Sequence, residues 1–114
     1  MRRIDELKFA LGQAILESEE YRSYKEALAE IRKRPDLMRE LDEYRKKSFT
    51  IQNSSEVDNM FDATLNLNRE YDTLVNTGEV SRFLMCELML SMLIQDICKS
   101  ILEPLDFDID FLNS

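Results

Sequence analysis

Glycine and proline are scarce in this chain, which contains only two of each among its 114 residues. A β-sheet protein of this length needs many more turn residues, because its chain reverses after every short strand. Apolar residues instead recur at alternating spacings of three and four, as at Ile4, Leu7 and Leu11, which places them on one face of an α-helix. The sequence therefore predicts an all-α protein of about five helices, arranged as long antiparallel hairpins or a bundle.

Local signals indicate where the predicted helices begin and end. Ser18 precedes two glutamates and is a typical N-cap, while Pro35 favours a break because proline suits a first helical turn and restricts the residue before it. Residues 53–55 (Asn-Ser-Ser) predict a loop, and the last of these serines with Asp58 resembles a capping box. Gly78 is a candidate left-handed C-cap. The predicted helices cover approximately residues 4–16, 19–34, 35–51, 57–74 and 80–102.

We expect a single helical domain over residues 1–104, because the chain has the length of one domain and 44% apolar residues to form its core. After Pro104 the pattern changes, since apolar residues alternate with aspartates from Leu105 to Phe111. That period of two is not helical. Residues 105–114 are therefore predicted to be an acidic-hydrophobic C-terminal tail, which either lies over the helices or docks on another chain.

The last predicted helix, residues 80–102, is apolar nearly all round. One stripe includes Phe83, Leu90 and Ile97, and a second stripe on roughly the opposite side consists of Met85, Leu88, Met89 and Met92. A helix that is apolar all round must be covered all round. Either a second copy covers the methionine-rich side, giving a homodimer or a higher oligomer, or this helix lies at the centre of its own bundle. Methionine suits both alternatives, because its flexible side chain fills gaps in cores and adapts to interfaces.

Acidic residues outnumber basic residues by 23 to 15, which gives a net charge of −8. Strong direct binding of nucleic acid is not expected, because such binding depends on clustered lysines and arginines that displace counterions from phosphates. The densest basic cluster surrounds the predicted break at Pro35 and consists of Arg32, Lys33, Arg34 and Arg39. It is either the positive charge that a helix C-terminus favours, or a docking site for an acidic partner or a weak RNA contact.

Nothing in the sequence predicts catalysis. Histidine is absent, which removes the commonest general base and the commonest metal ligand. There is no glycine-rich phosphate loop, no Cys–His or Ser–His arrangement and no cluster with metal-ligand spacing. Glu87 is the one acid beside the apolar stripe of the last helix, where we expect it to reach solvent or an arginine. The expected protein is not an enzyme and requires no cofactor or metal.

The cysteines and the distribution of charge suggest where the protein is located. Cys86 and Cys98 are about 18 Å apart along one predicted helix, too far to form a disulfide, so we expect both to be small buried hydrophobes in a reducing compartment. Residues 80–102 contain four charged side chains, too many for a membrane span. No apolar segment of a signal peptide follows the first residues. A cytoplasmic protein without membrane insertion is expected.

Three segments resemble the YlbF/YmcA family of small helical bacterial regulatory proteins. They are the Tyr-x-x-Tyr-Lys segment at residues 21–25, Pro35-Asp36-Leu37, and the charged stretch at residues 41–47. An apolar last helix follows them, as it does in YheA/YmcA-like proteins. The resemblance implies an all-α fold, self-association and no catalytic activity.

The same resemblance implies an accessory role in the cell. Family members are linked to competence, biofilm formation and sporulation, and some modulate ribonuclease Y and so the maturation of messenger RNA. Certain members carry iron–sulfur clusters through C-terminal cysteines, but residues 105–114 contain no cysteine, so no cluster is expected here. The expected function is that of a regulatory adaptor. The alternative is a helical scaffold or chaperone-like oligomer without a role in RNA processing.

Overall fold

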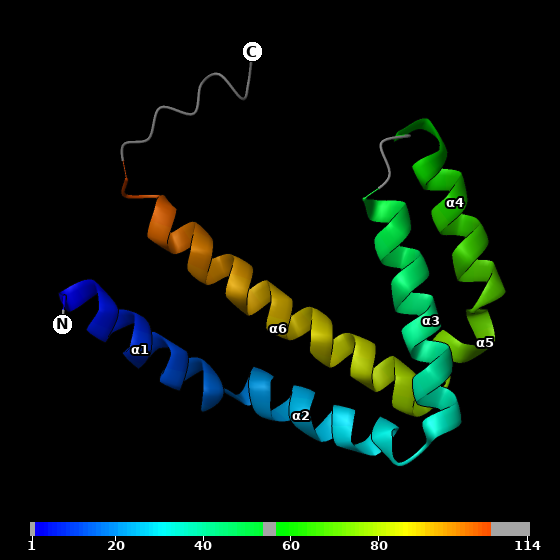
Figure 1. Ribbon diagram of the computed structural model, residues 1–114, viewed down its shortest axis with the longest axis horizontal. Coiled ribbons are helices and arrows are strands. Elements are labelled where there is room, and N and C mark those ends of the chain that lie inside the picture. Colours follow the sequence, from blue (N-terminus) through cyan, green and yellow to red (C-terminus); the bar gives the residue numbers. More distant parts are fainter. Residues whose placement is uncertain (1, 54–56, 106–114) are drawn as a thin grey trace.

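A computed structural model of the protein describes residues 2–53 and 57–105, and these residues form six helices without a strand (Figure 1). The all-α prediction is therefore confirmed. The helices are α1 (Arg3–Leu16), α2 (Glu19–Arg32), α3 (Pro35–Gln52), α4 (Val57–Glu70), α5 (Asp72–Val75) and α6 (Gly78–Leu102). The predicted tail lies outside the described residues apart from Leu105, and so do the second and third loop residues at 54–55.

The first two predicted breaks, at Ser18 and Pro35, are confirmed. The Ser18 hydroxyl accepts a hydrogen bond from the Tyr21 backbone N–H at 3.1 Å and donates one to the Ile15 carbonyl at 2.6 Å. One side chain thus ends α1 and starts α2. Pro35 is the first residue of α3, where its missing N–H has no helical partner to lose.

The structure differs from prediction between α4 and α6. The continuous helix expected to extend to residue 74 is divided by a turn at Tyr71 into α4 and the short α5. Gly78 does not cap α5 in a left-handed conformation, because no described glycine has a positive φ. It is instead the first residue of α6, after Thr77 in an extended conformation. The capping box predicted at Ser55 and Asp58 lies outside the residues whose side chains are described.

The core lies where α2, α3, α5 and the first turns of α6 meet. α2 packs along the start of α6 in the opposite direction, and α3 crosses them at the corner (Figure 1). The eight buried residues of this cluster are all apolar: Ala27, Leu28, Ile31, Leu37, Leu41, Leu74, Val80 and Phe83. The core therefore occupies one corner of the molecule.

Two arms extend from that corner (Figure 1). The α3–α4 hairpin forms one arm, while α1 and the second half of α6 extend in the other direction. The radius of gyration is 18.1 Å, against about 13 Å for a compact domain of this length. This open shape leaves large helix faces uncovered by the chain itself.

Candidate functional site

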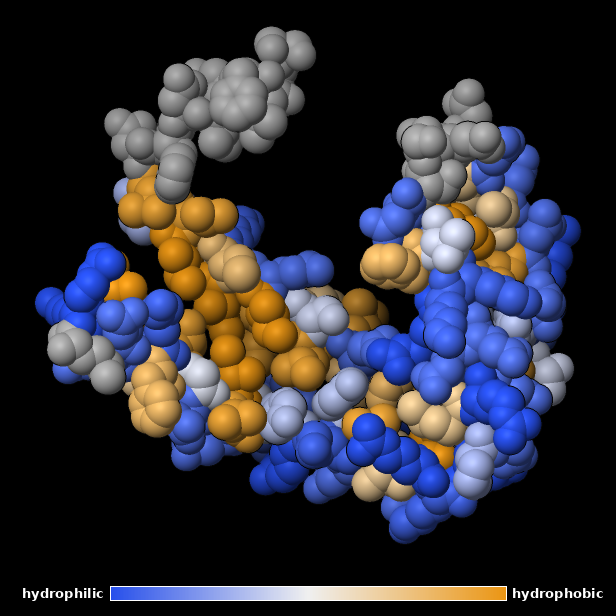
Figure 2. All heavy atoms as spheres, viewed as in Figure 1, coloured by the Kyte–Doolittle hydropathy of each residue, from blue (hydrophilic) through white to orange (hydrophobic). Residues whose placement is uncertain are grey.

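The methionine stripe, defined as Met85, Leu88, Met89 and Met92, is an uncovered apolar surface on α6. Its four side chains are between 48% and 58% exposed, whereas Phe83 on another face of the same helix is completely buried. Figure 2 shows apolar side chains gathered along α6. The chain's own helices do not cover this stripe, which excludes a position for it in the chain's own core. Its coverage by a second copy stays a prediction, because the structure describes one chain.

A second apolar surface lies on α1 and the later turns of α6. The row formed by Ile4, Leu7 and Leu11, predicted to share one helix face, is exposed, and α1 contains no buried residue. Ile94 and Ile101 on α6 are exposed as well. Sequence periodicity identified these faces as apolar, but it could not show that the chain leaves them without cover.

The predicted basic cluster lies at the turn between α2 and α3, and all four of its residues are exposed. Lys33 pairs with Glu30 at 3.1 Å, and Arg34 pairs with Glu79 of α6 at 3.3 Å. Among the described residues no ion pair involves Arg32 or Arg39. The free positive charge of the turn therefore belongs to these two arginines.

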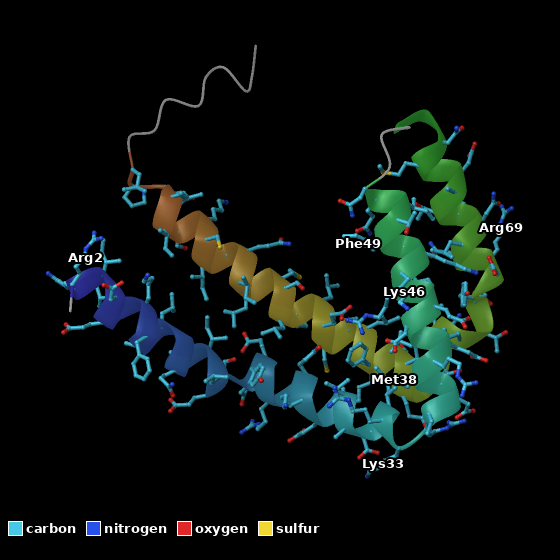
Figure 3. All side chains as sticks on the ribbon, viewed as in Figure 1. Arg2, Lys33, Met38, Lys46, Phe49 and Arg69 are labelled. Carbon is cyan, nitrogen blue, oxygen red and sulfur yellow. The ribbon has the colours of Figure 1, made fainter. Side chains whose placement is uncertain are left out.

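The α3–α4 arm carries a surface that was not predicted. A hollow of about 520 Å³ lies between the two helices and is lined mainly by apolar atoms. Phe49 on α3 and Phe61 on α4 are both exposed. Figure 3 locates Phe49 beside Lys46 on α3.

The base of this arm is held by Lys47. Its ammonium lies 5.0 Å from the centre of the Tyr71 ring and 3.1 Å from a Glu70 carboxylate oxygen. Its side-chain hydrogen bonds, first with Tyr71 and then with Glu70, raise the pKa of Lys47 above its ordinary value. These contacts fasten α3 to the turn between α4 and α5.

The structure locates the acid and the two cysteines that the sequence analysis singled out. Glu87 pairs with Arg45 at 2.8 Å, which confirms the expectation that it would reach an arginine. Cys86 is half-buried, while Cys98 is exposed, so the expectation that both cysteines are buried is wrong for Cys98. No group of three potential metal ligands occurs among residues 2–53 and 57–105.

None of the described helices combines the length and the apolarity that crossing a bilayer requires.

The chain is similar to a known protein family and to two bacterial proteins. A family model described as "Control of competence regulator ComK, YlbF/YmcA" matches residues 4–106. A UPF0342 protein of Caldicellulosiruptor bescii is 26% identical over 94% of this chain and 92% of its own length. A UPF0342 protein of Symbiobacterium thermophilum is 29% identical over 90% of this chain and 93% of its own length. No solved structure matches the chain at a significant level.

Proposed function

Since the chain belongs to the YlbF/YmcA family, which is linked to control of the competence regulator ComK, we propose that it is a non-enzymatic regulatory adaptor. It acts in the cytoplasm through contacts with other proteins. The observation that carries this proposal is the methionine stripe, an apolar surface that the chain itself leaves exposed. Exposed apolar faces of this kind mark sites of protein association.

The adaptor associates with itself through α6 and with a different protein through the α2–α3 turn. Methionine side chains adapt to a packed interface, which supports self-association at the stripe. Arg32 and Arg39 are exposed near this turn and belong to no described ion pair on a protein of net charge −8, and local positive charge can orient an acidic partner despite the overall charge.

A ribonuclease complex that matures messenger RNA is the partner we propose, in keeping with the role of family members described above. A scaffold or chaperone-like oligomer without a role in RNA processing is the second candidate, and the large exposed apolar area favours it. The identity of the captured protein distinguishes the two.

The experiment compares two double variants in affinity capture from the native cell. Arg32→Glu with Arg39→Glu removes the free charge of the turn without breaking a described ion pair. Lys25→Glu with Arg69→Glu is the matched control, because these residues are also exposed and their reversal gives the same change in net charge, from −8 to −12.

We expect the turn variant to keep its circular-dichroism signal and oligomeric state while losing the partner, and the control to retain it. Capture by the original protein should weaken as salt rises, since exposed charges are screened. Equal recovery by both variants would show that the turn is only a solvated helix end. Recovery of client proteins of many kinds, without a ribonuclease, would favour the second candidate.

A further inference from the structure

The contacts of α1 within the chain are too few to account for its stability as a helix. α1 has 14 residues, none of them buried, and Ile4 and Leu7 are 54% and 55% exposed. An isolated helix of this length is marginal in water, because helices in proteins are stabilised mainly by burying an apolar face. Its contacts within the chain are chiefly with α2, across the short connection at Ser18.

The later turns of α6 also lack buried residues. Val80 and Phe83, in its first two turns, are the only buried residues of this 25-residue helix. The methionine stripe lies on one side of the remainder, and Ile94 and Ile101 are exposed on another. A helix with apolar residues on several sides must be covered on several sides.

We propose that α1 and the later turns of α6 from two copies of this chain form one four-helix bundle, in which each α1 covers the α6 surface of the other copy. The inference rests on the self-association proposed above and extends it to α1. A symmetric dimer uses the same patch on both subunits. This arrangement therefore buries the apolar residues of α1 and those of the later turns of α6 in a single interface.

Charge supports a second copy as the occupant. The protein as a whole would repel its own copy at a net charge of −8. However, α1 carries two basic and two acidic residues, and α6 carries two basic and three acidic residues. These two helices therefore contribute only −1, and like-charge repulsion between copies is small at this surface.

Surface area gives a second argument. The accessible surface is 9183 Å², against about 6,500 Å² for a compact monomer of 13.5 kDa. Not all of this excess of roughly 2,700 Å² lies on α1 and α6, because the α3–α4 arm is also open. A third of it would still supply the about 800 Å² that each partner contributes to a stable interface.

The test uses two double variants of α1 in the full-length chain. Leu7→Asp with Leu11→Asp places two charges on the apolar row. Phe9→Asp with Gln13→Asp is the control, because these exposed residues have the same spacing on the opposite face of the helix. Neither pair is part of the buried core, so the α2–α6 packing should survive in both.

Sedimentation equilibrium should show the dissociation constant of the dimer raised at least about 100-fold by the first pair, because unpaired charges would be desolvated in the interface. The control should change it by less than about threefold. An unchanged constant for Leu7→Asp with Leu11→Asp overturns the role of α1. Met89→Asp then distinguishes self-association through the methionine stripe from the additional role of α1. If only Met89→Asp dissociates the dimer, the stripe mediates self-association without α1. If the wild-type protein is a monomer, both proposals are wrong.

Hydrogen exchange of the unmodified protein gives a readout that does not depend on variants. Backbone amides of residues 7–16 should exchange at least about tenfold more slowly above the dissociation constant than below it. Amides near Ile31 in α2 should not respond to concentration in this way. Protection of α1 that is independent of concentration would show that the helix is stable without a second copy and would overturn the proposal.

Discussion

Phe83 is the residue on which the packing of this protein converges. Its ring is completely buried, lies 5.4 Å from the ring of Tyr24 on α2, and is covered by the Arg45 guanidinium of α3 at 5.4 Å. Arg45 in turn pairs with Glu87, one turn further along α6. A single aromatic side chain therefore connects three helices.

Phe83→Ala should lower the free energy of unfolding by about 3–5 kcal/mol, because the lost apolar contacts and the resulting cavity both destabilise the fold. Phe61→Ala is the matched control, since Phe61 is 72% exposed and its loss should change stability by less than about 0.5 kcal/mol. Urea denaturation at one fixed protein concentration measures both. Equal effects of the two substitutions would contradict the position of the core.

The element that most clearly separates prediction from structure is the start of α6. Gly78 begins that helix with a negative φ, and a Cβ built on it would meet no heavy atom within 4 Å. Had Gly78 been a left-handed C-cap, any side chain there would be strained. Its actual conformation suits alanine.

Gly78→Ala should therefore stabilise the protein by about 0.4–1 kcal/mol, chiefly by restricting the unfolded chain. Thermal denaturation of the full chain would measure it, with Gly12→Ala inside α1 as a comparison, because that position is equally open. If Gly78→Ala instead destabilises the protein, that result would support the left-handed C-cap predicted from the sequence.

At the scale of elements, predictability follows the range of the interactions involved. Ser18 and Pro35 act on the neighbouring backbone, so the sequence places their breaks correctly. The turn at Tyr71 was not predictable, because Leu67, Tyr71 and Leu74 continue the helical spacing through it. Residues at and after that turn make tertiary contacts. The centre of the Tyr71 ring lies 5.5 Å from the centre of the Tyr44 ring, and Leu74 is buried in the core. No local residue type explains it.

At the scale of the whole molecule, apolar faces are predictable and their coverage is not. Periodicity identifies the face of α1 and both stripes of α6, but only the three-dimensional arrangement shows that eight of the nine buried apolar residues in the described part of the chain cluster at one corner, with Leu67 of α4 buried apart from them (Figure 1). The basic cluster was predicted as four residues, and long-range pairing with Glu79 reduces its available charge. The exposed phenylalanines of the α3–α4 arm, Phe49 and Phe61, were missed because helical spacing shows which residues share a face, but not that the pairing of α3 with α4 leaves both rings exposed.

The composition of the methionine stripe has a chemical consequence. Three of its four side chains are thioethers, which peroxide oxidises to polar sulfoxides when they are accessible. Assembly would shield these sulfur atoms, so dilution should speed their oxidation, and oxidation should in turn oppose reassembly. Met38, half-buried against the core of the same chain, is an internal reference whose oxidation should not depend on concentration. Mass spectrometry after peroxide treatment at two protein concentrations would measure this, and equal rates for Met89 at both would contradict it. Under oxidative stress, such a protein would dissociate into single chains as the methionines of its interface are oxidised.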